Sequence, residues 1–372
     1  MRHPSAYLDW YIHVPKVRHD LRSSGLTGFR YDLNLGQIDL SVNYDHSGNP
    51  ETTRLLAERY DVKPENIFIT SEGASGTNAR IIRFIAEKNL EKNEAIIEYP
   101  TYEPLLRLVQ EYFPTVKRFE RKKEDNYRLD IESIAKAITS KTGVLILTNP
   151  HAPSAAIADP KDMKELSNLA HQHGFHVLSD EIYGEFNRKA VPTVFSMDPE
   201  SSIVTTSFTK AYALGGLKLG IAILDEQLVK ELYQDVLNTI GNSANIVQMV
   251  ANDLLRNLSK LEDYLDRWEK IKATTEEWLH DNGMRYFPNN SGVTYWIETS
   301  VDDTNKWIND TAIPLYDLAM VPGAHFLFKN DYELTKSNMI RIGLGAIAPT
   351  DDNVERALEN LENALRKYKS HT

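Results

Sequence analysis

The chain has 372 residues, no cysteine and a formal net charge of -11 at pH 7. This acidic balance argues against nucleic acid or an anionic membrane as the main partner, because neither favours a negative protein surface. The lack of cysteine excludes disulfides, thiolate metal sites and a cysteine nucleophile, and it fits a cytoplasmic location. No apolar run approaches the ~20 residues of a membrane span, and the first residues lack the apolar core of a secretory signal. We therefore expect a cytoplasmic protein of about two domains that acts on a small molecule.

The first forty residues contain aromatic, basic and turn-forming residues without a long periodic run. The pattern predicts a short helix from Tyr7 to Val14, followed by an extended arm. From Asn43 the pattern changes, and a turn at Gly48 and Pro50 leads into an amphipathic helix.

Short β-branched runs then alternate with helical patterns, which is typical of βαβ units and a mostly parallel sheet. The predicted strands are Ile67 to Thr70, Ala95 to Glu98, Val144 to Thr148, Phe175 to Ser179, Ile203 to Thr206 and Leu219 to Leu224. Ligands of such sheets bind at the carboxyl ends of the strands. The turns that follow the first five strands should therefore converge on one pocket.

Beyond Asp225 the pattern changes to long helices. A seam of apolar residues at spacings of three and four could cross from one domain to the next, and it consists of Leu258, Leu261, Leu265 and Trp268. A smaller α/β unit follows, with strands near Val293 to Glu298 and Met339 to Gly343. The last helix has one apolar stripe, made of Val354, Ala357, Leu358, Leu361, Ala364 and Leu365.

The turn after the first of these strands, from Thr70 to Asn78, is rich in small residues and leads into a helix. Small residues at a helix start leave backbone N–H groups exposed toward an anion, and the hydroxyls of Ser75 and Thr77 could add donors. The turn therefore indicates a phosphate site. The alternative is a tight strand-to-helix turn, which needs small residues in any case.

Three further residues at strand ends have both a functional and a structural interpretation. Tyr102 could stack on a planar ligand or simply pack. Asp180 falls where an apolar strand stops, so a partly buried carboxylate there needs a cation or hydrogen-bond donors, unless it only caps the next helix. Tyr183 follows one helical turn later, close enough to act at the same site.

The turn after Thr206 contains Ser207, Lys210 and Lys218. A lysine at the end of a strand is costly to bury, but it suits a nucleophile that must reach a bound carbonyl compound. Taken alone, Lys210 is more simply a solvated loop lysine. Combined with a phosphate site, a carboxylate and an aromatic ring, it points to an aldehyde cofactor with a phosphate arm and a pyridine ring, which is pyridoxal phosphate.

The segment SFTKAYALGGLKLG resembles the lysine motif of class I and II aminotransferases, which are pyridoxal-phosphate enzymes of fold type I related to aspartate aminotransferase. The other turns resemble the family in the same order: GAS, YPTY, an altered NPxNP[TS]G loop, D-x-x-Y and a late arginine in MIRIGLG. The resemblance covers nearly the whole chain. It implies an α/β fold, with a large domain built on a mostly parallel sheet flanked by helices and a smaller α/β domain built from both chain ends. The expected boundaries are 1–42 for the arm and part of the small domain, 43–270 for the large cofactor-binding domain and 271–372 for the rest of the small domain.

The resemblance also implies a role for individual residues. Lys210 would form a Schiff base with the cofactor and, once displaced by substrate, carry the proton between the substrate Cα and the cofactor. Asp180 would keep the pyridine nitrogen protonated, which requires a low carboxyl pKa. Tyr183 would donate to the phenolic oxygen of the cofactor, and Tyr102 would stack on its ring.

The remaining implied contacts are those to phosphate, substrate and the second subunit. The phosphate would be held by Gly73, Ala74, Ser75, Ser207 and Lys218. Arg341 would bind the substrate α-carboxylate through its planar fork. Gly36 is a candidate substrate contact, and Tyr44 would reach the phosphate of the neighbouring subunit in a homodimer with shared active sites.

Two departures from the family pattern affect the expected site. Lys218 stands where the family usually has arginine, which keeps the charge but loses the bidentate fork. The family asparagine that contacts the phenolic oxygen falls on Ala152, and the glycine of that loop falls on Ala155. Loss of the asparagine hydrogen bond should weaken cofactor binding by about 1–2 kcal/mol.

The expected activity is therefore transfer of an amino group between an L-amino acid and a 2-oxo acid, in two half-reactions and without a metal. Two alternatives remain open. One is a pyridoxal-phosphate lyase that catalyses α,β-elimination, because lyases share these turns. The other is a non-catalytic cofactor-binding relative, which the alanines at 152 and 155 suggest but which the intact Lys210, Asp180 and Arg341 oppose. The amino donor and acceptor do not follow from the sequence.

Overall fold

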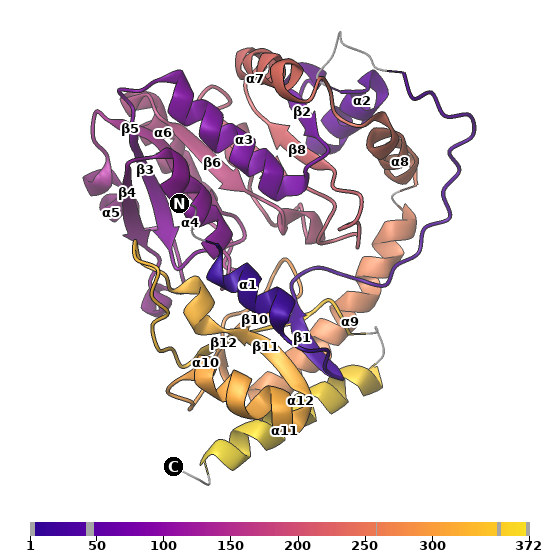
Figure 1. Ribbon diagram of the computed structural model, residues 1–372, viewed down its shortest axis with the longest axis vertical. Coiled ribbons are helices and arrows are strands. Elements are labelled where there is room, and N and C mark those ends of the chain that lie inside the picture. The colour runs from indigo at the N-terminus through magenta and orange to yellow at the C-terminus, as the bar shows by residue number, and fades with distance from the viewer. Residues whose placement is uncertain (1–3, 42–47, 258, 348–350, 370–372) are drawn as a thin grey trace.

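The structure is a computed structural model that describes residues 4–41, 48–257, 259–347 and 351–369. It is an α/β protein with two separate sheets, and helices cover both of them (Figure 1). The fold class predicted from the sequence is confirmed. Within the described residues, no helix is long and apolar enough to cross a membrane.

The larger sheet contains seven strands in the order β2-β8-β7-β6-β5-β3-β4. Their bounds are β2 Ile67–Thr70, β3 Glu94–Tyr99, β4 Thr115–Glu120, β5 Thr142–Thr148, β6 His176–Asp180, β7 Ser202–Thr206 and β8 Gly220–Ile223. The strands from β3 to β7 run parallel, whereas β8 is antiparallel to both β2 and β7. All six predicted strands are present. Their apolar runs are continuous because helices bury both faces of the sheet.

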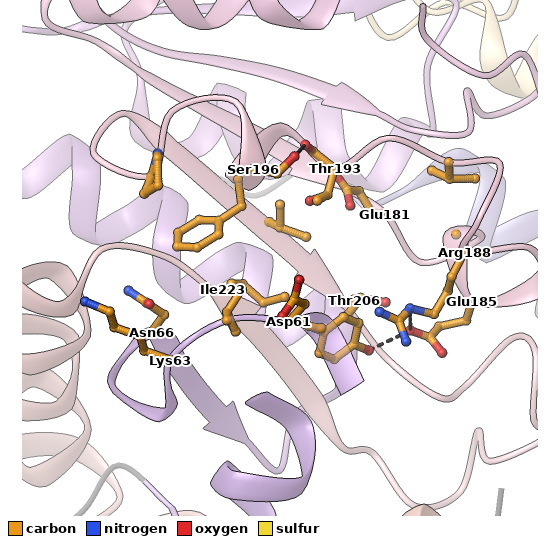
Figure 2. Close-up of a pocket in the computed structure, with 17 residues that line it drawn as sticks. Asp61, Lys63, Asn66, Glu181, Glu185, Arg188, Thr193, Ser196, Thr206 and Ile223 are labelled. Atoms are coloured by element: carbon orange, nitrogen blue, oxygen red, sulfur yellow. Dashed lines mark hydrogen bonds and ion pairs between the residues drawn. The ribbon is translucent and has the colours of Figure 1, made fainter. Parts of the chain in front are cut away.

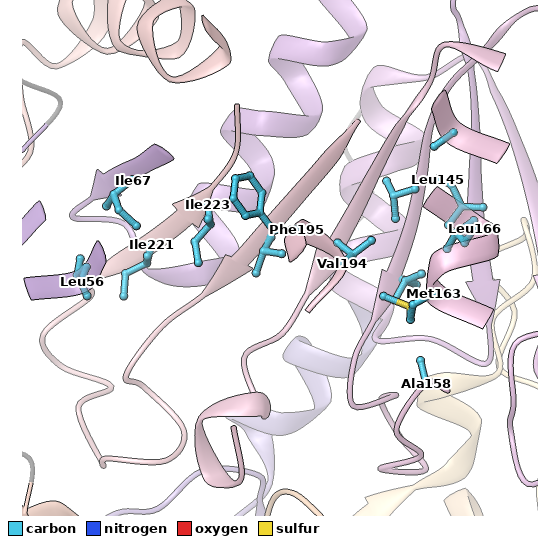
Figure 3. Close-up of a cluster of buried hydrophobic side chains, with 14 of the residues drawn as sticks. Leu56, Ile67, Leu145, Ala158, Met163, Leu166, Val194, Phe195, Ile221 and Ile223 are labelled. Carbon is cyan, nitrogen blue, oxygen red and sulfur yellow. The ribbon is translucent and has the colours of Figure 1, made fainter. Parts of the chain in front are cut away.

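Two layers of helices enclose this sheet. One layer consists of α3 Gly73–Lys88, α4 Glu103–Tyr112 and α7 Glu226–Thr239, and it packs on one face through residues such as Ile82, Leu106 and Leu232. The other layer consists of α2 Pro50–Tyr60, α5 Ile131–Ala137, α6 Pro160–His173 and α8 Asn245–Arg256. Figure 3 shows part of the core under this second layer, where Leu56 and Leu166 pack toward the sheet. The two layers leave the carboxyl ends of the parallel strands as the open edge.

The smaller sheet contains five strands in the order β1-β11-β12-β10-β9. They are β1 His19–Ser23, β9 Arg285–Tyr286, β10 Thr294–Glu298, β11 Leu318–Pro322 and β12 Met339–Leu344. The long helices α9 Ser259–Asp281 and α12 Asp351–Lys369 cover it, and the short helices α10 Thr304–Trp307 and α11 Ile313–Tyr316 complete the unit. The apolar stripe predicted for the last helix is confirmed, because all six of its residues are buried. In the predicted seam Trp268 is buried, whereas Leu258 and the side chain of Leu261 lie outside the described residues.

The N-terminal segment differs from the predicted extended arm. The short helix is confirmed as α1 Ala6–His13, but residues 19–23 form β1, which pairs in parallel with β11 and β12. The sequence HDLRS has one apolar residue among polar ones, so its pattern did not indicate a strand. Leu21 from β1 packs with Trp268 and Leu361, so both chain ends contribute to one core. The domain boundaries at 42/43 and 270/271 stay predictions.

Candidate active site

A cavity of about 290 Å³ lies where the carboxyl ends of the large-sheet strands meet α1 and β12. This is near the lower end of the roughly 300–1,000 Å³ range of small-molecule sites. Its lining includes the predicted cofactor residues Gly73, Ala74, Ser75, Tyr102, Asp180 and Tyr183. It also includes Lys210, Lys218 and Arg341. The structure therefore brings together turns that are far apart in the sequence.

Lys210 follows β7 in the turn that leads toward β8. Its Nζ donates a hydrogen bond to Ser24 Oγ at 3.0 Å. Gly25 lies directly against the same lysine, since a Cβ added to it would come within 2.8 Å of Lys210 Cδ. Burial is the main cause that lowers the pKa of Lys210, and the positive charge of Arg341 adds to it. A lowered pKa increases the fraction of neutral amine, which is the nucleophilic form.

Asp180 ends β6 and is buried. Its Oδ2 accepts a hydrogen bond from Asn78 Nδ2 at 2.8 Å, and its Oδ1 accepts one from the Ile182 amide at 3.2 Å. Burial raises the pKa of Asp180 above its ordinary value, although these donors and Lys210 lower it. The low pKa expected from the sequence is therefore not supplied by the chain alone. A protonated ring nitrogen would be the missing cationic partner.

Tyr183 and Tyr102 form the aromatic part of the cavity. The backbone oxygen of Tyr183 accepts a hydrogen bond from Ser291 Oγ at 2.6 Å, so a loop of the small unit holds this residue. Burial raises the pKa of both phenols. The ring of Tyr102 packs edge-on against Tyr7, with centroids 5.7 Å apart.

The start of α3 forms the candidate phosphate site. The amide of Gly73 already donates to the Lys218 carbonyl at 2.7 Å, so it is not available to a phosphate. The amides of Ala74 and Ser75 lie in the first helical turn, where no intrahelical acceptor exists. The Lys218 side chain is exposed and lines the cavity. These groups fit an anion at this helix start.

Ser207, which was predicted to hold the phosphate, does not line the cavity. It is buried, and its hydroxyl pairs with Thr209 Oγ1 at 2.6 Å. Thr209 lines the cavity instead, so Ser207 orients the threonine hydroxyl that faces it.

Arg341, on β12, has the hydrogen-bonding capacity expected of a carboxylate-binding residue. Its Nη2 donates to the Arg22 carbonyl at 2.7 Å and to the Tyr7 hydroxyl at 3.3 Å. Its buried Nε has no partner among the described residues. A buried guanidinium N–H without an acceptor is costly, so a ligand carboxylate fits here.

The altered loop places Ala152 in the cavity wall and Ala155 behind it. The Ala152 amide donates to Thr148 Oγ1 at 2.8 Å, so the loop is anchored although the family asparagine is missing. Ala155 adopts a φ of +61°, a conformation that glycine reaches without steric cost. The loop therefore keeps a backbone shape suited to the family glycine.

Two further predicted residues fall between β1 and α2, and Gly36 does not line this cavity. Tyr44 lies outside the described residues. Gly36 belongs to the largely exposed segment 27–41 and has a φ of +54°, and a Cβ added to it would meet nothing within 4 Å. The roles of Gly36 and Tyr44 stay predictions.

Sequence reasoning missed several lining residues, chiefly Tyr7 and Ser24, together with Asn78, which supports Asp180. The small-residue turn after β1 was a signal for Ser24, because its glycine permits close approach to another backbone. A buried asparagine in the otherwise apolar face of α3 was a signal for Asn78. Tyr7 gave no signal, because only the tertiary packing of α1 brings it to the site.

A second cavity, of about 450 Å³, lies on the other side of the residues that follow β6 (Figure 2). Glu181 lines it, next in sequence to Asp180, and burial raises its pKa to about 8. Thr206 also lines this cavity, and its buried hydroxyl has no partner among the described residues. Thr205, the residue before it in β7, does not line this cavity. Thr205 and Thr206 therefore face opposite sides of the sheet, as consecutive residues of a strand do.

Known proteins share both the sequence pattern and the fold. The family model named Aminotransferase class I and II matches residues 38–361. Aromatic-amino-acid aminotransferase 2 of Thermococcus litoralis is 24% identical over 377 residues, which cover 96% of this chain and 89% of that protein. An aspartate aminotransferase of Pyrococcus horikoshii is 27% identical over 243 residues, covering 63% of this chain and 59% of that protein. The solved structure of Thermotoga maritima aspartate aminotransferase has a TM-score of 0.81, with 17% identity and 98% of each chain covered.

The family match extends over most of the chain and includes every motif from the α3 turn to Arg341. The two relatives above are named as aminotransferases and not as lyases, so they do not support the elimination alternative. The fit of the cavity to an aldehyde cofactor with a phosphate arm agrees with this family. The chain belongs to the class I and II aminotransferase family and is a pyridoxal-phosphate-dependent aminotransferase.

Proposed function

We propose that the protein transfers an amino group between an aromatic L-amino acid and a 2-oxo acid, with Lys210 as the nucleophile and Arg341 as the carboxylate-binding residue. The observation that carries this proposal is one cavity lined by a lysine of lowered pKa and a buried arginine with a free N–H. When bound, pyridoxal phosphate supplies an aldehyde that condenses with amines and a ring that accepts electrons.

The chain's own residues orient the cofactor in this proposal. The amides at the start of α3 and the Lys218 ammonium bind the phosphate. Asp180 would hold the ring nitrogen, Tyr102 would pack on the ring, and Tyr183 would hold the phenolic oxygen. Support comes from their position around one cavity.

Lys210 and Arg341 act on the substrate. The Arg341 Nε, which lacks a partner among the described residues, donates to the α-carboxylate and fixes the position of the substrate Cα. Lys210, which lines the same cavity, would take the proton from the substrate Cα as its neutral amine. Ser24 accepts a hydrogen bond from Lys210 and so holds the amine in the cavity.

The preference for an aromatic side chain comes from the wall that α1 contributes. Tyr7, Leu8 and Tyr11 line this wall. The cationic side chains among the described lining residues are Lys210, Lys218 and Arg341. Each has a proposed role toward the cofactor or the α-carboxylate, so none of them is left to bind a second carboxylate of the substrate. Aromatic rings favour aromatic side chains through area burial and edge-to-face contacts.

The test is amino transfer to 2-oxoglutarate from L-phenylalanine and, separately, from L-aspartate. We expect equal amounts of glutamate and 2-oxo acid, and a kcat/KM for phenylalanine at least roughly tenfold above that for aspartate. Preference for aspartate would contradict the substrate proposal. Release of ammonia and a 2-oxo acid without glutamate would contradict amino transfer and favour elimination.

The role of Lys210 is tested with Lys210→Ala. The wild-type protein should show a visible absorbance band from a lysine-linked cofactor, and the variant should lose the band and the activity. Lys218→Ala is the matched control, since it should weaken cofactor binding and keep the band at saturating cofactor. A band that persists in Lys210→Ala would contradict the assignment.

We further propose that the protein is a homodimer. Large apolar side chains are exposed on the segment 27–41 and near α8, namely Leu33, Ile38, Leu40, Ile240 and Ile246. Exposed large apolar side chains are typical of an interface when they lie together, as Leu40 and Ile240 do. In a dimer, Gly36 and Tyr44 would contact the cavity of the second subunit.

Leu40→Glu tests the dimer, because Leu40 is 66% exposed in this group. The variant should be monomeric by light scattering and should lose activity, since each cavity would lack its neighbour's contacts. Leu90→Glu is the control, because Leu90 is 77% exposed just beyond the end of α3. A monomeric wild-type protein with full activity would contradict the proposal.

A cytoplasmic location is also proposed. It is supported by the cysteine-free sequence, which fits a reducing compartment. Fractionation of cells that express the protein should recover it with cytoplasmic markers, and recovery in a secreted fraction would contradict this.

A further inference from the structure

The carboxylate proposed to face the ring nitrogen is held by a side chain from α3. Asn78 Nδ2 donates to Asp180 Oδ2 at 2.8 Å, and the Ile182 amide donates to the other oxygen at 3.2 Å. Asn78 is only 3% exposed and does not line the cavity. It is therefore placed to act through Asp180 and not on a ligand directly.

The orientation of the Asn78 amide is fixed from behind by β7. Thr205 Oγ1 donates to Asn78 Oδ1 at 2.6 Å, and Thr205 is fully buried. Thr205 is also the register partner of Asp180 between β7 and β6. Because an ionised carboxylate only accepts, the amide nitrogen must face Asp180, and the threonine hydroxyl then has the amide oxygen as its acceptor.

We propose that Asn78 and Thr205 are positioning residues that aim the Asp180 carboxylate at the ring nitrogen of the cofactor and stabilise its ionised form. This inference rests on the proposed role of Asp180. A neutral donor suits the task, because a lysine or arginine in place of Asn78 would neutralise Asp180 and compete with the protonated ring nitrogen. The same hydrogen bond opposes the effect of burial on the pKa of Asp180.

The helix that carries Asn78 also carries the proposed phosphate site. Asn78 lies three residues after Ser75 in α3, which corresponds to a rise of about 4.5 Å along the helix axis. One rigid helix thus contributes to both ends of the cofactor site. The helix start would hold the phosphate, and Asn78 holds the carboxylate that would meet the ring nitrogen.

The test compares two cofactors in binding to the apoprotein: pyridoxal phosphate and 1-deaza-pyridoxal phosphate, in which C–H replaces the ring nitrogen. Asn78→Leu should weaken binding of pyridoxal phosphate roughly tenfold, as is typical when an outer-shell partner is lost. It should weaken binding of the deaza analogue by less than about twofold, because that analogue has no ring nitrogen for Asp180 to bind. Equal losses for both cofactors would show a merely structural role and overturn the proposal.

Two adjacent threonines give a second test and its matched control. Thr205→Val removes the hydroxyl that orients Asn78, so it should reproduce the selective loss for pyridoxal phosphate, and Thr205→Ser should restore binding. Thr206→Val removes a buried hydroxyl that lines the second cavity and has no partner among the described residues (Figure 2), so it should leave both affinities unchanged. Equal effects of Thr205→Val and Thr206→Val would overturn the proposal even if Asn78→Leu did not fold.

This outcome is distinguishable from a failure of the proposed function. If the wild-type protein binds no pyridoxal phosphate, the proposed function itself is wrong. If the wild type binds it and transfers amino groups, but the variants show no selectivity between the two cofactors, only the role of Asn78 and Thr205 is wrong.

Discussion

Lys210 donates its hydrogen bond to Ser24, a residue that no sequence motif singled out. Ser24→Ala removes the acceptor of the charged amine, so the pKa of Lys210 should fall further. Acylation of Lys210 in the apoprotein, followed by peptide mass spectrometry, should therefore reach its half-maximal rate at a lower pH. Ser23→Ala is the control, because the Ser23 hydroxyl donates to the Gly25 carbonyl and not to the lysine. An unchanged pH profile in Ser24→Ala would contradict this role.

Glu181 gives a prediction for stability against pH. Burial raises its pKa from 4.5 to about 8. The free energy of unfolding should therefore fall as pH rises through this window, because the unfolded chain releases the proton at a lower pH than the folded one. Glu181→Gln keeps an acceptor for the Val194 amide but cannot ionise. The difference in free energy of unfolding, variant minus wild type, should increase by on the order of 4 kcal/mol between about pH 5 and about pH 9.

Denaturant unfolding at the two pH values measures this difference. Glu200→Gln, at an exposed position, should show no such gain. A difference that stays constant with pH would mean that Glu181 is ionised in the folded protein throughout.

At the scale of elements, a buried ion pair joins β3 to the loop that follows β4. Arg121 Nη1 donates to Glu98 Oε2 at 3.0 Å, and neither side chain is exposed to solvent. Glu98 Oε1 also accepts from the Thr148 hydroxyl, whose oxygen in turn accepts from the Ala152 amide. The pair therefore supports the loop that borders the cavity.

Arg121→Met should reduce the free energy of unfolding by about 3–5 kcal/mol, because it leaves the Glu98 carboxylate buried without its cation. The double variant with Glu98→Gln should recover most of this loss, since no unpaired charge remains. Chemical denaturation of the two variants and the wild type gives the comparison. Equal instability of the single and double variants would show that shape, and not charge, determines the effect.

Strands that are buried on both faces could be predicted from the sequence, whereas strands with few buried residues could not. The central strands of the large sheet are apolar on both faces, so their runs were visible in the sequence. The edge strand β4, TVKRFE, has only two apolar residues among charged ones, and β1 has a single apolar residue inside the sheet, Leu21, so neither showed a run. Strands of this kind are stabilised mainly by partners distant in sequence, which a local pattern does not contain.

Some residues of the site could likewise be predicted from the sequence, and others could not. Residues in turns directly after predicted strands, such as Asp180 and Lys210, could be predicted because parallel strands bring their carboxyl ends to one edge. Ser24 reaches the cavity because β1 pairs with β11 and β12, across about 300 residues of chain. Tyr7 reaches it because the Glu103 carboxylate of α4 holds the start of α1. The raised pKa of Asp180 also could not be predicted, because it depends on how completely the folded chain excludes water.

At the scale of the whole molecule, α1 connects the two units of the chain. The Glu103 carboxylate, at the start of α4, accepts hydrogen bonds from the Ser5 hydroxyl and from the amides of Ala6 and Tyr7. At the other side of the helix, Trp10 Nε1 donates to Asn309 Oδ1 at 3.0 Å. In Figure 1 the helix lies between the large and small sheets. A carboxylate at a helix N-terminus is favourable for the helix dipole, so this contact fixes α1 on the large unit.

Glu103→Gln should loosen this contact and so displace the α1 wall of the cavity. We expect KM for the amino donor to rise roughly three- to tenfold, while the affinity for pyridoxal phosphate changes by less than about twofold. Steady-state kinetics and cofactor titration measure the two effects. Arg107→Gln is the control, because Arg107 pairs with Glu103 and donates its other hydrogen bonds to Gln110 and to the Asp331 carbonyl. Equal losses of substrate and cofactor binding would mean that Glu103 supports the whole site.

The origin of the cavity walls has a consequence for directed evolution. The cofactor side is built by loops of the large sheet and by α3, whereas Tyr7, Leu8 and Tyr11 all come from one helix of eight residues. A single mutagenic cassette over α1 would therefore randomise most of the substrate side and leave the cofactor contacts unaltered. Selection from such a library could change the accepted amino acid without a compensating search elsewhere in the gene.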